Sequence, residues 1–317
     1  MDSRASSGAG GQRAGSLGFG YAHPAYAESL AEFGVPRELP RCGGWILERD
    51  VPGFTNRDGR GCYPLFFCRD WSRLDADLTE IGGDLVSVSL VTDPFGEYES
   101  AYLERCFDVV RPFKEHFVID CSRPIDAVVS KNHRYQTRKA LKQIQVERCG
   151  DPARFLDEWV ALYDILVKRH DLRGIQAFSR AAFSKHLNIP GVFALRALHQ
   201  GVTVGGLLGF FQGDLAYAHL AASSDLGYEL GASYALFWTA IEQLHGKVRW
   251  FSIGGTAGIS RNESSGLDFF KRGWSRETRT VYFCGRILNR ERYQSIVEAM
   301  GAPPTDYFPA YRHGEFG

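Results

Sequence analysis

Apolar residues recur along this chain at two spacings, and the alternation between them predicts a mixed α/β protein. In the first half of the chain, apolar residues three or four apart predict helices, and runs rich in aromatic or β-branched residues predict strands. The expected helices cover 23–33, 98–110 and 126–144, and the expected strands cover 44–48, 63–68, 85–91 and 116–121.

The pattern begins again in the second half. Asp151 is a capping residue and Pro152 favours the first position of a helix. Helices are expected at 155–166, 180–187, 233–244, 266–271 and 289–300, and strands at 192–198, 202–211, 215–222, 248–253 and 280–286. Turn signals at 200–201 and 212–214 join the first three of these strands as hairpins. The elements alone indicate a mixed α/β protein and no particular family.

Composition narrows the class of protein. Lys plus Arg and Asp plus Glu both number 37, so the whole chain has no net charge that would attract nucleic acid or membranes. No apolar run approaches the roughly 20 residues that span a bilayer. Residues 1–20 are rich in Gly, Ser and Ala and lack an apolar core, so we expect a disordered tail and not a secretory signal.

The cysteines favour a reducing compartment. All seven are scattered and none forms a Cys-x-x-Cys pair, which is typical of reduced thiols in a cytoplasmic protein. Cys106, His116 and Cys121 come nearest to a zinc pattern, but their spacing is not that of clustered ligand pairs. We therefore expect no metal.

The segment from Trp250 to Trp274 carries the most chemical information. An apolar strand ends in Gly254-Gly255, a polar loop follows, and Gly266-Leu267-Asp268-Phe269-Phe270-Lys271 comes next. This order places one cation beside a strand end, although a surface lysine next to two core phenylalanines would give the same pattern. The segment resembles the closing part of the Fem-type (FemABX) aminoacyl transferases, a branch of the GNAT acyltransferase superfamily. The resemblance implies that Lys271 acts on the acyl group being transferred, with Phe270 beside the substrate.

The same resemblance implies a fold. Two helices, a three-strand meander, a helix, a strand, a helix and a strand form the GNAT core order, and the second half of the chain follows it. The implied fold class is α/β (α+β), with two GNAT-like halves, each a mixed sheet flanked by helices. The first half would cover 21–147, with 288–317 packing back on it, and the second half would cover 148–287.

A basic segment at 130–148 is a second candidate site. On a helix, Arg134, Arg138 and Lys142 would share one face, where like charges repel unless a polyanion binds. The segment predicts a surface for the phosphates of tRNA, coenzyme A or a nucleotide-linked acceptor; a solvated face is the alternative. Fem-type proteins carry a similar Ser-x-x-x-Arg…Arg-Lys segment, matched here by Ser130, Arg134, Arg138 and Lys139.

A glycine-containing segment at 227–234 is a weaker candidate. A turn that follows a strand and opens a helix exposes N–H groups to an anion. GNAT enzymes that use acetyl-CoA carry an Arg or Gln, then Gly, then Gly or Ala there. Tyr228, Gly231 and Ser233 occupy these positions, so the cationic or amide residue is missing. An ordinary turn is the alternative.

Several further residues are candidates for proton transfer or acceptor binding. Tyr217 and His219 are two apart on an expected strand and so face the same side. His219 could accept the amine proton, or it could be a core histidine. Asp93 lies where a strand ends, which suits either a cleft or a plain turn. Arg261 and Glu263, on the loop before Lys271, could bind an acceptor or merely face water.

These observations lead to three functional hypotheses. The first is an N-acyltransferase that moves an aminoacyl group from aminoacyl-tRNA to a small-molecule or peptide amine, for example of a cell-wall precursor. The second is an acyl-CoA-dependent N-acyltransferase acting on a sugar or small-molecule amine. The third is a non-catalytic module that binds RNA or a phosphorylated ligand. No permanently bound cofactor is expected under any of them, since no Walker, Rossmann or HExxH motif is present.

Overall fold

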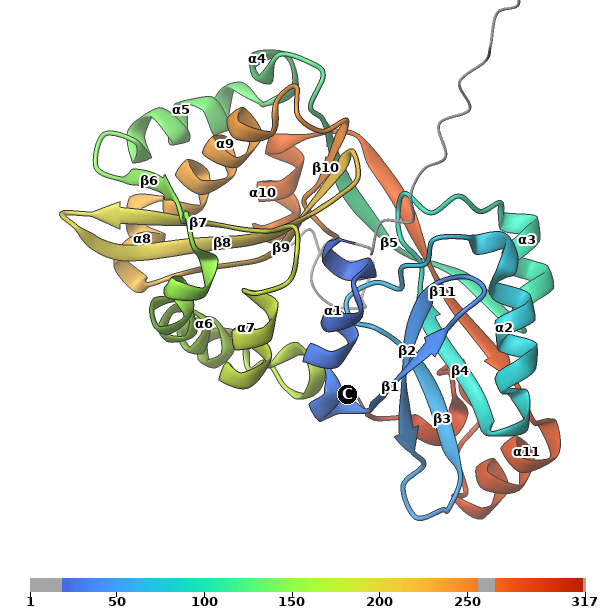
Figure 1. Cartoon of the computed structure of the whole chain (residues 1–317). Helices are drawn as coiled ribbons and strands as arrows, with labels where there is room; N and C mark the ends of the chain where they lie inside the picture. The colour runs from blue at the N-terminus through green and yellow to red at the C-terminus, as the bar shows by residue number, and fades with distance from the viewer. Residues whose placement is uncertain (1–18, 256–265, 316–317) are drawn as a thin grey trace, which may run out of the picture.

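One mixed sheet runs through the molecule. The computed structural model describes residues 19–255 and 266–315, and in this part of the chain eleven strands join in the order β1-β2-β3-β4-β11-β5-β10-β9-β8-β7-β6 (Figure 1). The β3–β4 and β10–β9 pairs are parallel and the others are antiparallel. The strands are β1 Val35–Leu39, β2 Gly44–Asp50, β3 Arg57–Gly61, β4 Leu85–Val91, β5 Val109–Asp120, β6 Gln145–Arg148, β7 Val192–His199, β8 Val202–Gln212, β9 Leu215–Ser223, β10 Trp250–Ser252 and β11 Thr278–Ile287.

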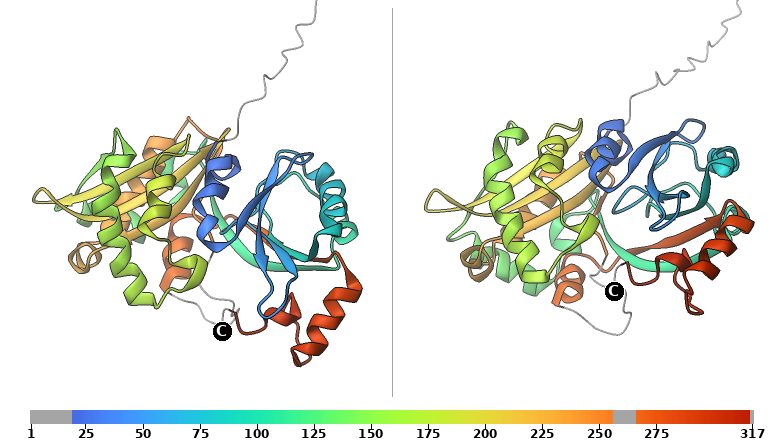
Figure 2. Two further views of the ribbon diagram at one scale, coloured as in Figure 1. Left: turned by 60° about the horizontal axis from the view of Figure 1, so that its bottom comes forward. Right: turned by 90° about the horizontal axis from the view of Figure 1, so that it is seen from below.

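Helices cover both faces of the sheet. The α-helices are α1 Pro24–Ser29, α2 Leu74–Glu80, α3 Ser100–Cys106, α4 Ile125–Val128, α5 Lys131–Ala140, α6 Leu156–His170, α7 Arg180–His186, α8 Asp225–Leu230, α9 Ala232–Leu244, α10 Gly266–Trp274 and α11 Arg290–Ala299. Around strands β6 to β10, α5, α9 and α10 lie on one face of the sheet, and α6 and α7 lie on the other (Figures 1 and 2). This arrangement confirms the expected α/β fold class.

Two long strands cross between the halves. β5 pairs with β11 from Val109 to Phe117 and with β10 from Val118 to Asp120. β11 follows the second half in sequence, yet it lies between β4 and β5. Each half therefore depends on a strand from the other part of the chain, and the strands of both halves form one continuous sheet.

Glycines in β8 allow side chains from helices and from the neighbouring strand to pack directly against its backbone. A Cβ on Gly206 would stand 2.9 Å from the Phe155 ring, and one on Gly205 would stand 3.1 Å from Ala232 Cβ. At Gly209 the Phe193 ring would be only 2.2 Å from an added Cβ. These distances explain why the strand carries so many glycines: close packing needs them, and no dinucleotide site is involved.

The C-terminal segment after β11 packs on the first half. Helix α11 lies against β4, and Ile296 and Tyr311 share a small core with Val51 and Val86 (Figure 2). The 3-10 turn at Ala310–Arg312 (η7) completes this packing.

Several expected elements need correction. The run at 63–68 is not a strand, although Phe66 forms a single bridge to Thr92. The expected helix at 98–110 ends at Cys106, because 109–110 already belong to β5. The expected basic helix at 126–144 is two helices, α4 and α5, separated by Val129 and Ser130. Nearly all of the expected tail, 1–18, lies outside the described residues.

Candidate active site

Lys271 is buried at the inner side of α10. Only 9% of the residue is exposed, and Nζ donates a hydrogen bond to the Gly255 carbonyl oxygen beyond the end of β10. Trp274, one turn further along α10, is fully buried against Phe237 and Tyr234 of α9 and so fixes the helix in place. Burial, together with the positive charge of Lys114, lowers the pKa of Lys271 to about 7. The lysine is therefore not the surface residue that the sequence pattern also allowed.

The glycine pair at the end of β10 shapes the space around this amine. Gly254 has a φ of +77°, and an added Cβ would stand 3.2 Å from Lys271 Nζ. At Gly255 an added Cβ would stand 3.1 Å from the His116 ring. The glycines thus bring the lysine and the histidine to the same short stretch of backbone.

His116 and Lys114 belong to this site, and the sequence did not reveal their role there. His116 of β5 is buried, and its Nδ1 makes no hydrogen bond within the described chain. Burial and the charges of Lys271 and Lys114 lower the pKa of His116 to about 3, which keeps the ring neutral. The sequence showed a histidine on an expected strand, but it could not show that this histidine lies near Lys271. The pairing of β5 with the end of β10 joins residues that are far apart in the chain.

Asp93 and Tyr217 meet across the two halves. The Tyr217 hydroxyl donates a 3.1 Å hydrogen bond to Asp93 Oδ1, and the Phe95 backbone N–H donates another at 3.0 Å. Burial raises the pKa of Asp93 to about 7 despite these bonds and the nearby charge of Arg279. The Arg279 guanidinium lies over the rings of Phe95 and Trp250, at 4.5 and 5.1 Å.

The sheet register connects Tyr217, the partner of Asp93, with His116. Tyr217 is opposite Ser252, which is opposite Val118; His116 is two residues before Val118 and opposite Arg279. Partners and alternate residues of a sheet point to the same face, so Tyr217, His116 and Arg279 share one face. Arg279 in turn places its charge on Asp93. The charge of Lys271 acts on His116 of this face, which relates the Asp93–Tyr217 pair to the lysine through the strands β9, β10 and β5.

His219 lies in a different environment. It falls at a register shift of β9, where no residue of β8 is opposite it, and its Nδ1 is 2.9 Å from the Tyr21 hydroxyl. The rings of His186 and Phe178 lie 5.1 and 5.7 Å away. Burial and the neighbouring His186 hold the pKa of His219 well below its usual range. The Tyr21 ring contacts both Tyr217 and His219, so the two do face the same side.

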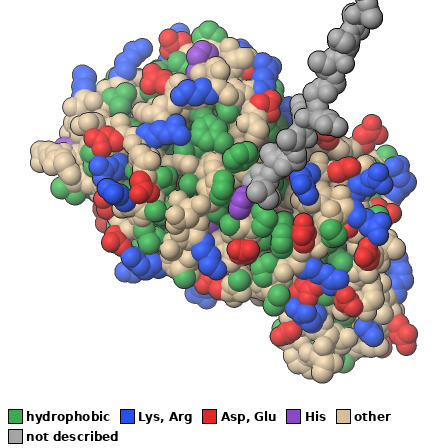
Figure 3. Space-filling view, in the orientation of Figure 1, with side chains coloured by type: hydrophobic (Ala, Val, Ile, Leu, Met, Phe, Trp, Pro, Cys, Tyr) green, Lys and Arg blue, Asp and Glu red, His purple; other side chains and the backbone are tan. Residues whose placement is uncertain are grey.

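The basic segment forms an exposed stripe on α5. Ser130 caps the helix by accepting a hydrogen bond from the His133 backbone N–H. Among the exposed residues of the segment are Lys131, Tyr135, Arg138, Lys139 and Lys142, which we call the α5 stripe. Blue side chains stand along the edge of the molecule where α5 runs (Figure 3).

The α5 stripe differs from the expected face in two ways. Arg134 is partly buried and pairs with Asp126 at 3.2 Å, so it contributes less free charge than expected. Lys142 lies in the turn after the helix, which ends at Ala140. Among the described residues, the side chains of Arg138, Lys139 and Lys142 make no hydrogen bond or ion pair, and Tyr135, one turn before Arg138 and Lys139, is 63% exposed. Cations without partners next to an aromatic ring suit a polyanionic ligand.

The expected turn at 227–234 is mostly helical, which corrects the sequence interpretation. Tyr228 lies within α8, is exposed, and stacks under the Arg169 guanidinium at 5.2 Å. Gly231, with a φ of +77°, joins α8 to α9, and Ser233 is in the first turn of α9. The glycine therefore connects two helices instead of following a strand.

The remaining candidates divide between α10 and the loop before it. The Phe270 ring packs against Phe237 and Tyr234, and its carbonyl oxygen is 2.7 Å from His133 Nε2. Gly273 faces the same histidine, because an added Cβ would clash with the His133 ring. Arg261 and Glu263 lie outside the described residues.

Neither a metal cluster nor a membrane span is found in the part of the chain that the structure describes. In residues 19–255 and 266–315, no three His, Cys, Asp or Glu side chains gather as a metal site would require. None of the helices described is both long and apolar enough to cross a bilayer.

Comparison with solved structures identifies the fold. FemX superposes with a TM-score of 0.63 at 15% identity, covering 86% of this chain and 93% of that chain. The C-terminal domain of a putative lysylphosphatidylglycerol synthetase from Agrobacterium fabrum gives 0.62 at 12% identity, covering 82% and 87%. L-PGS from Bacillus licheniformis gives 0.57 at 15% identity, covering 88% and 97%. Neither a protein-family model nor a curated protein sequence matches the chain. The chain shares the fold of FemX and of these two proteins, at identities that define the fold alone.

Proposed function

We propose that this chain is an N-acyltransferase that moves an aminoacyl group from aminoacyl-tRNA to a free amine of a peptide or cell-wall-type precursor. The observation that carries the proposal is the buried Lys271, whose amine is held at the glycine pair that ends β10. Burying a cation costs free energy, and a buried lysine with a strongly lowered pKa is a candidate functional residue; here it lies in a fold shared with FemX.

Lys271 would stabilise the transition state. Amide formation joins the amine nitrogen to the acyl carbon, breaks the ester bond to the tRNA ribose, and passes one proton from the amine to the leaving hydroxyl. The carbonyl oxygen carries negative charge in between. An ammonium has three N–H donors and Gly255 accepts one of them, so Lys271 can also donate to the oxyanion. One such donor is worth about 3–4 kcal/mol.

Among the candidates from the sequence, Asp93 has the pKa that best suits the amine proton. Its pKa of about 7 lets the carboxylate accept a proton at neutral pH, and Tyr217 fixes the orientation of Oδ1. His219, which the sequence also nominated, is bound to Tyr21 inside an aromatic cluster. We therefore assign proton transfer to Asp93, and a structural role to His219.

The α5 stripe supports a tRNA donor. Its cations lack partners in the described chain, and α5 contacts α10 through His133 and Phe270. A phosphate backbone bound along the α5 stripe would thus be tied to the helix that carries Lys271. An acyl-CoA donor is the second candidate, because the N-terminus of the 13-residue helix α9 follows Gly231 and offers N–H groups to a pyrophosphate.

One assay separates these hypotheses. The protein is incubated with charged tRNA or with acyl-CoA, together with a panel of amines, and the donor that is consumed is followed with the amide product. Loss of charged tRNA with amide formation supports the proposal, and consumption of acyl-CoA alone supports the second candidate. RNA binding without consumption of either donor contradicts both and indicates a binding module.

A further inference from the structure

An arginine-lined cavity lies away from Lys271, where the two halves and the C-terminal segment meet. Its volume is about 470 Å³, within the range of small-molecule sites. Arg49 of β2, Arg60 of β3, Arg173 of the α6–α7 connection and Arg312 of η7 line it. The acidic lining residues are Asp171 and Glu315, so the lining has an excess of positive charge.

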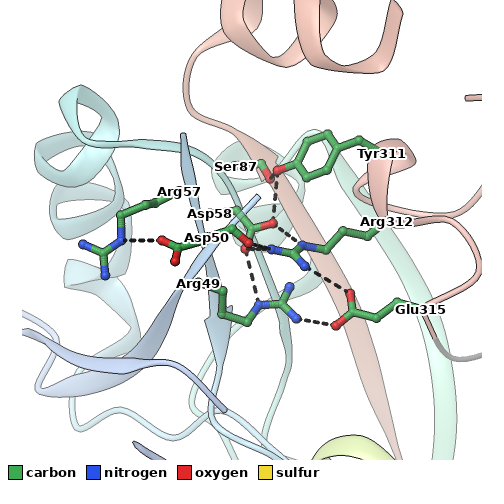
Figure 4. Close-up of polar contacts among 8 residues, drawn as sticks. All are labelled: Arg49, Asp50, Arg57, Asp58, Ser87, Tyr311, Arg312 and Glu315. Carbon is green, nitrogen blue, oxygen red and sulfur yellow. Dashed lines mark hydrogen bonds and ion pairs between the residues drawn. The ribbon is translucent and has the colours of Figure 1, made fainter. Parts of the chain in front are cut away.

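Two of these arginines are fixed from behind. Arg312 donates to both oxygens of Asp58, a carboxylate that is only 1% exposed, and the Tyr311 hydroxyl donates to the same group (Figure 4). Arg49 Nε is 3.3 Å from Asp58 Oδ1, and Arg49 Nη1 pairs with Glu315 at 2.6 Å. The network holds these head groups in place before any ligand arrives, so little conformational entropy would be lost on binding.

Arg60 shows that cations crowd this cavity. Burial and the positive charge of Arg49 lower the pKa of Arg60 to about 10, an unusual displacement for a guanidinium. A bound anion would relieve both causes, since it would replace lost solvation and oppose the repulsion.

Arg173 is able to change partners. It is 82% exposed and forms two hydrogen bonds to Asp171, at 2.7 and 3.2 Å. Exposed pairs of this kind contribute little to stability. Phe33 and Ile175 supply apolar walls beside it. Arg173 can therefore exchange Asp171 for an anionic group inside the cavity at little cost.

We propose that this cavity binds a small anion bearing at least two acidic oxygens, a phosphate or a carboxylate compound, through Arg60, Arg173 and Arg312. Guanidinium groups form paired hydrogen bonds to both kinds of anion. Because the lining comes from both halves and from the C-terminal segment, such a ligand would also link these three parts. Anion binding at this cavity does not depend on acyl transfer.

The test is calorimetric titration with inorganic diphosphate and with succinate, at constant ionic strength in a chloride buffer. At least one probe should bind to the wild-type protein. Arg173→Ala should weaken its binding about tenfold or more, the effect of removing one hydrogen bond between charged groups. Arg154→Ala is the matched control, since Arg154 is 88% exposed, pairs with Asp151, and lies outside the cavity; it should leave the affinity unchanged. Asp171→Asn should tighten binding, because it removes the charge that competes for Arg173 and because Asn tolerates the left-handed φ of +48°.

The outcomes are separable. Preference for diphosphate assigns the phosphate class, and preference for succinate assigns the carboxylate class. Absence of binding of both probes, or equal affinity of the Arg173 and Arg154 variants, overturns the proposal. The titration measures binding without acyl transfer, so failure of the anion site leaves the proposed function standing.

Discussion

At the residue scale, the proposed mechanism rests on two buried ionisable side chains. Lys271 has a pKa lowered to about 7 and Asp93 has a pKa raised to about 7, in both cases mainly through burial. The lysine is charged below this pH, and the carboxylate is charged above it. Each group alone is a common structural feature, but a lysine with a lowered pKa and a carboxyl group with a raised pKa fit an oxyanion donor and a base.

The first prediction concerns the pH dependence of transfer. Transfer needs charged Lys271 and charged Asp93, so kcat/KM should rise as Asp93 ionises, fall as Lys271 loses its proton, and peak near pH 7. Asp93→Asn should abolish the acidic limb and lower the rate by about 10²–10⁴-fold. The profile is measured between about pH 5 and pH 9. A wild-type profile that is flat across neutrality contradicts both assignments.

The second prediction concerns stability in acid. His186 is fully buried, stacks on Tyr26, and has a pKa lowered to about 3 by burial. An unfolded histidine takes up a proton near pH 6.5, whereas the folded protein resists it down to about pH 3. The group therefore costs nothing above pH 6.5 and destabilises the fold progressively below it, by about 2 kcal/mol at pH 5.

Urea unfolding at two pH values checks this sign. His186→Phe keeps the aromatic stack and removes the titration, so its loss of stability between about pH 7.5 and pH 5 should be smaller than in the wild-type protein. The exposed His245, on the loop before β10, provides the control variant His245→Phe, which should not change the slope. An equal slope in all three proteins contradicts the assignment to His186.

At the scale of elements, α5 and α10 form one unit around His133. The His133 ring lies between Phe270 and Trp274 of α10, and its Nε2 is bound to the Phe270 carbonyl oxygen. A ligand on the α5 stripe would therefore bind a helix that packs directly on α10, the helix that carries Lys271. Changes in the α5 stripe should affect donor binding more than the chemical step.

The third prediction tests the α5 stripe. Replacing Arg138, Lys139 and Lys142 with alanine should weaken donor binding and flatten its dependence on salt. The slope should change by about 0.7–0.9 units for each phosphate that is no longer neutralised. Arg105, Lys168 and Arg292 are exposed cations on other helices, so their joint replacement by alanine matches the change in charge. If both triple variants keep the wild-type salt dependence, the α5 stripe is a solvated surface.

Local pattern predicted most of the second half and less of the first. The meander of β7, β8 and β9 and the helices after it follow clear apolar periodicity. β3 escaped prediction because its sequence, Arg-Asp-Gly-Arg-Gly, is polar, and the buried Asp58 in it is paired with Arg312 and Arg49 from outside the strand. The run at 63–68 is apolar enough for a strand, but its side chains fill the core beside α1 and β4 without a continuous ladder.

The site was also predictable only in part, because local pattern does not show which distant residues surround a side chain. Lys271 could be found from its place after a glycine-terminated strand, and Asp93 from its place at a strand end. The environments of the two residues could not be predicted. Asp93 is 124 residues from its partner Tyr217, and Lys114 and His116 reach Lys271 only through strand pairing. Burial, which gives both groups their pKa values, is a property of the assembled sheet.

At the scale of the whole molecule, β5 and β11 join the halves into one sheet, because each pairs with strands from the other part of the chain. β11 pairs with β4 and β5, and β5 pairs with β10, so cutting the chain between the halves would leave each fragment without a central strand. Unpaired central strands expose backbone groups that need partners.

The fourth prediction follows from this strand pairing. Fragments 19–150 and 151–315, expressed separately, should each fail to give a cooperative unfolding transition, whereas the whole chain should unfold in one step. Circular dichroism with urea titration measures both. A fragment that unfolds cooperatively at a midpoint near that of the whole chain contradicts the described strand order.

The central claim, that Lys271 serves acyl transfer, is tested most directly by its replacement. Lys271→Met keeps the length and removes the charge, and because a buried ammonium that forms no ion pair with the described residues gives way to an apolar chain, the melting temperature should not fall. With the donor that the wild-type protein consumes, kcat should drop by about a hundredfold or more while KM changes little. Lys271→Arg should restore only part of the rate, since a planar guanidinium does not place charge as an ammonium does. If folded Lys271→Met transfers the acyl group at the wild-type rate, Lys271 does not stabilise the oxyanion and the proposed mechanism is wrong.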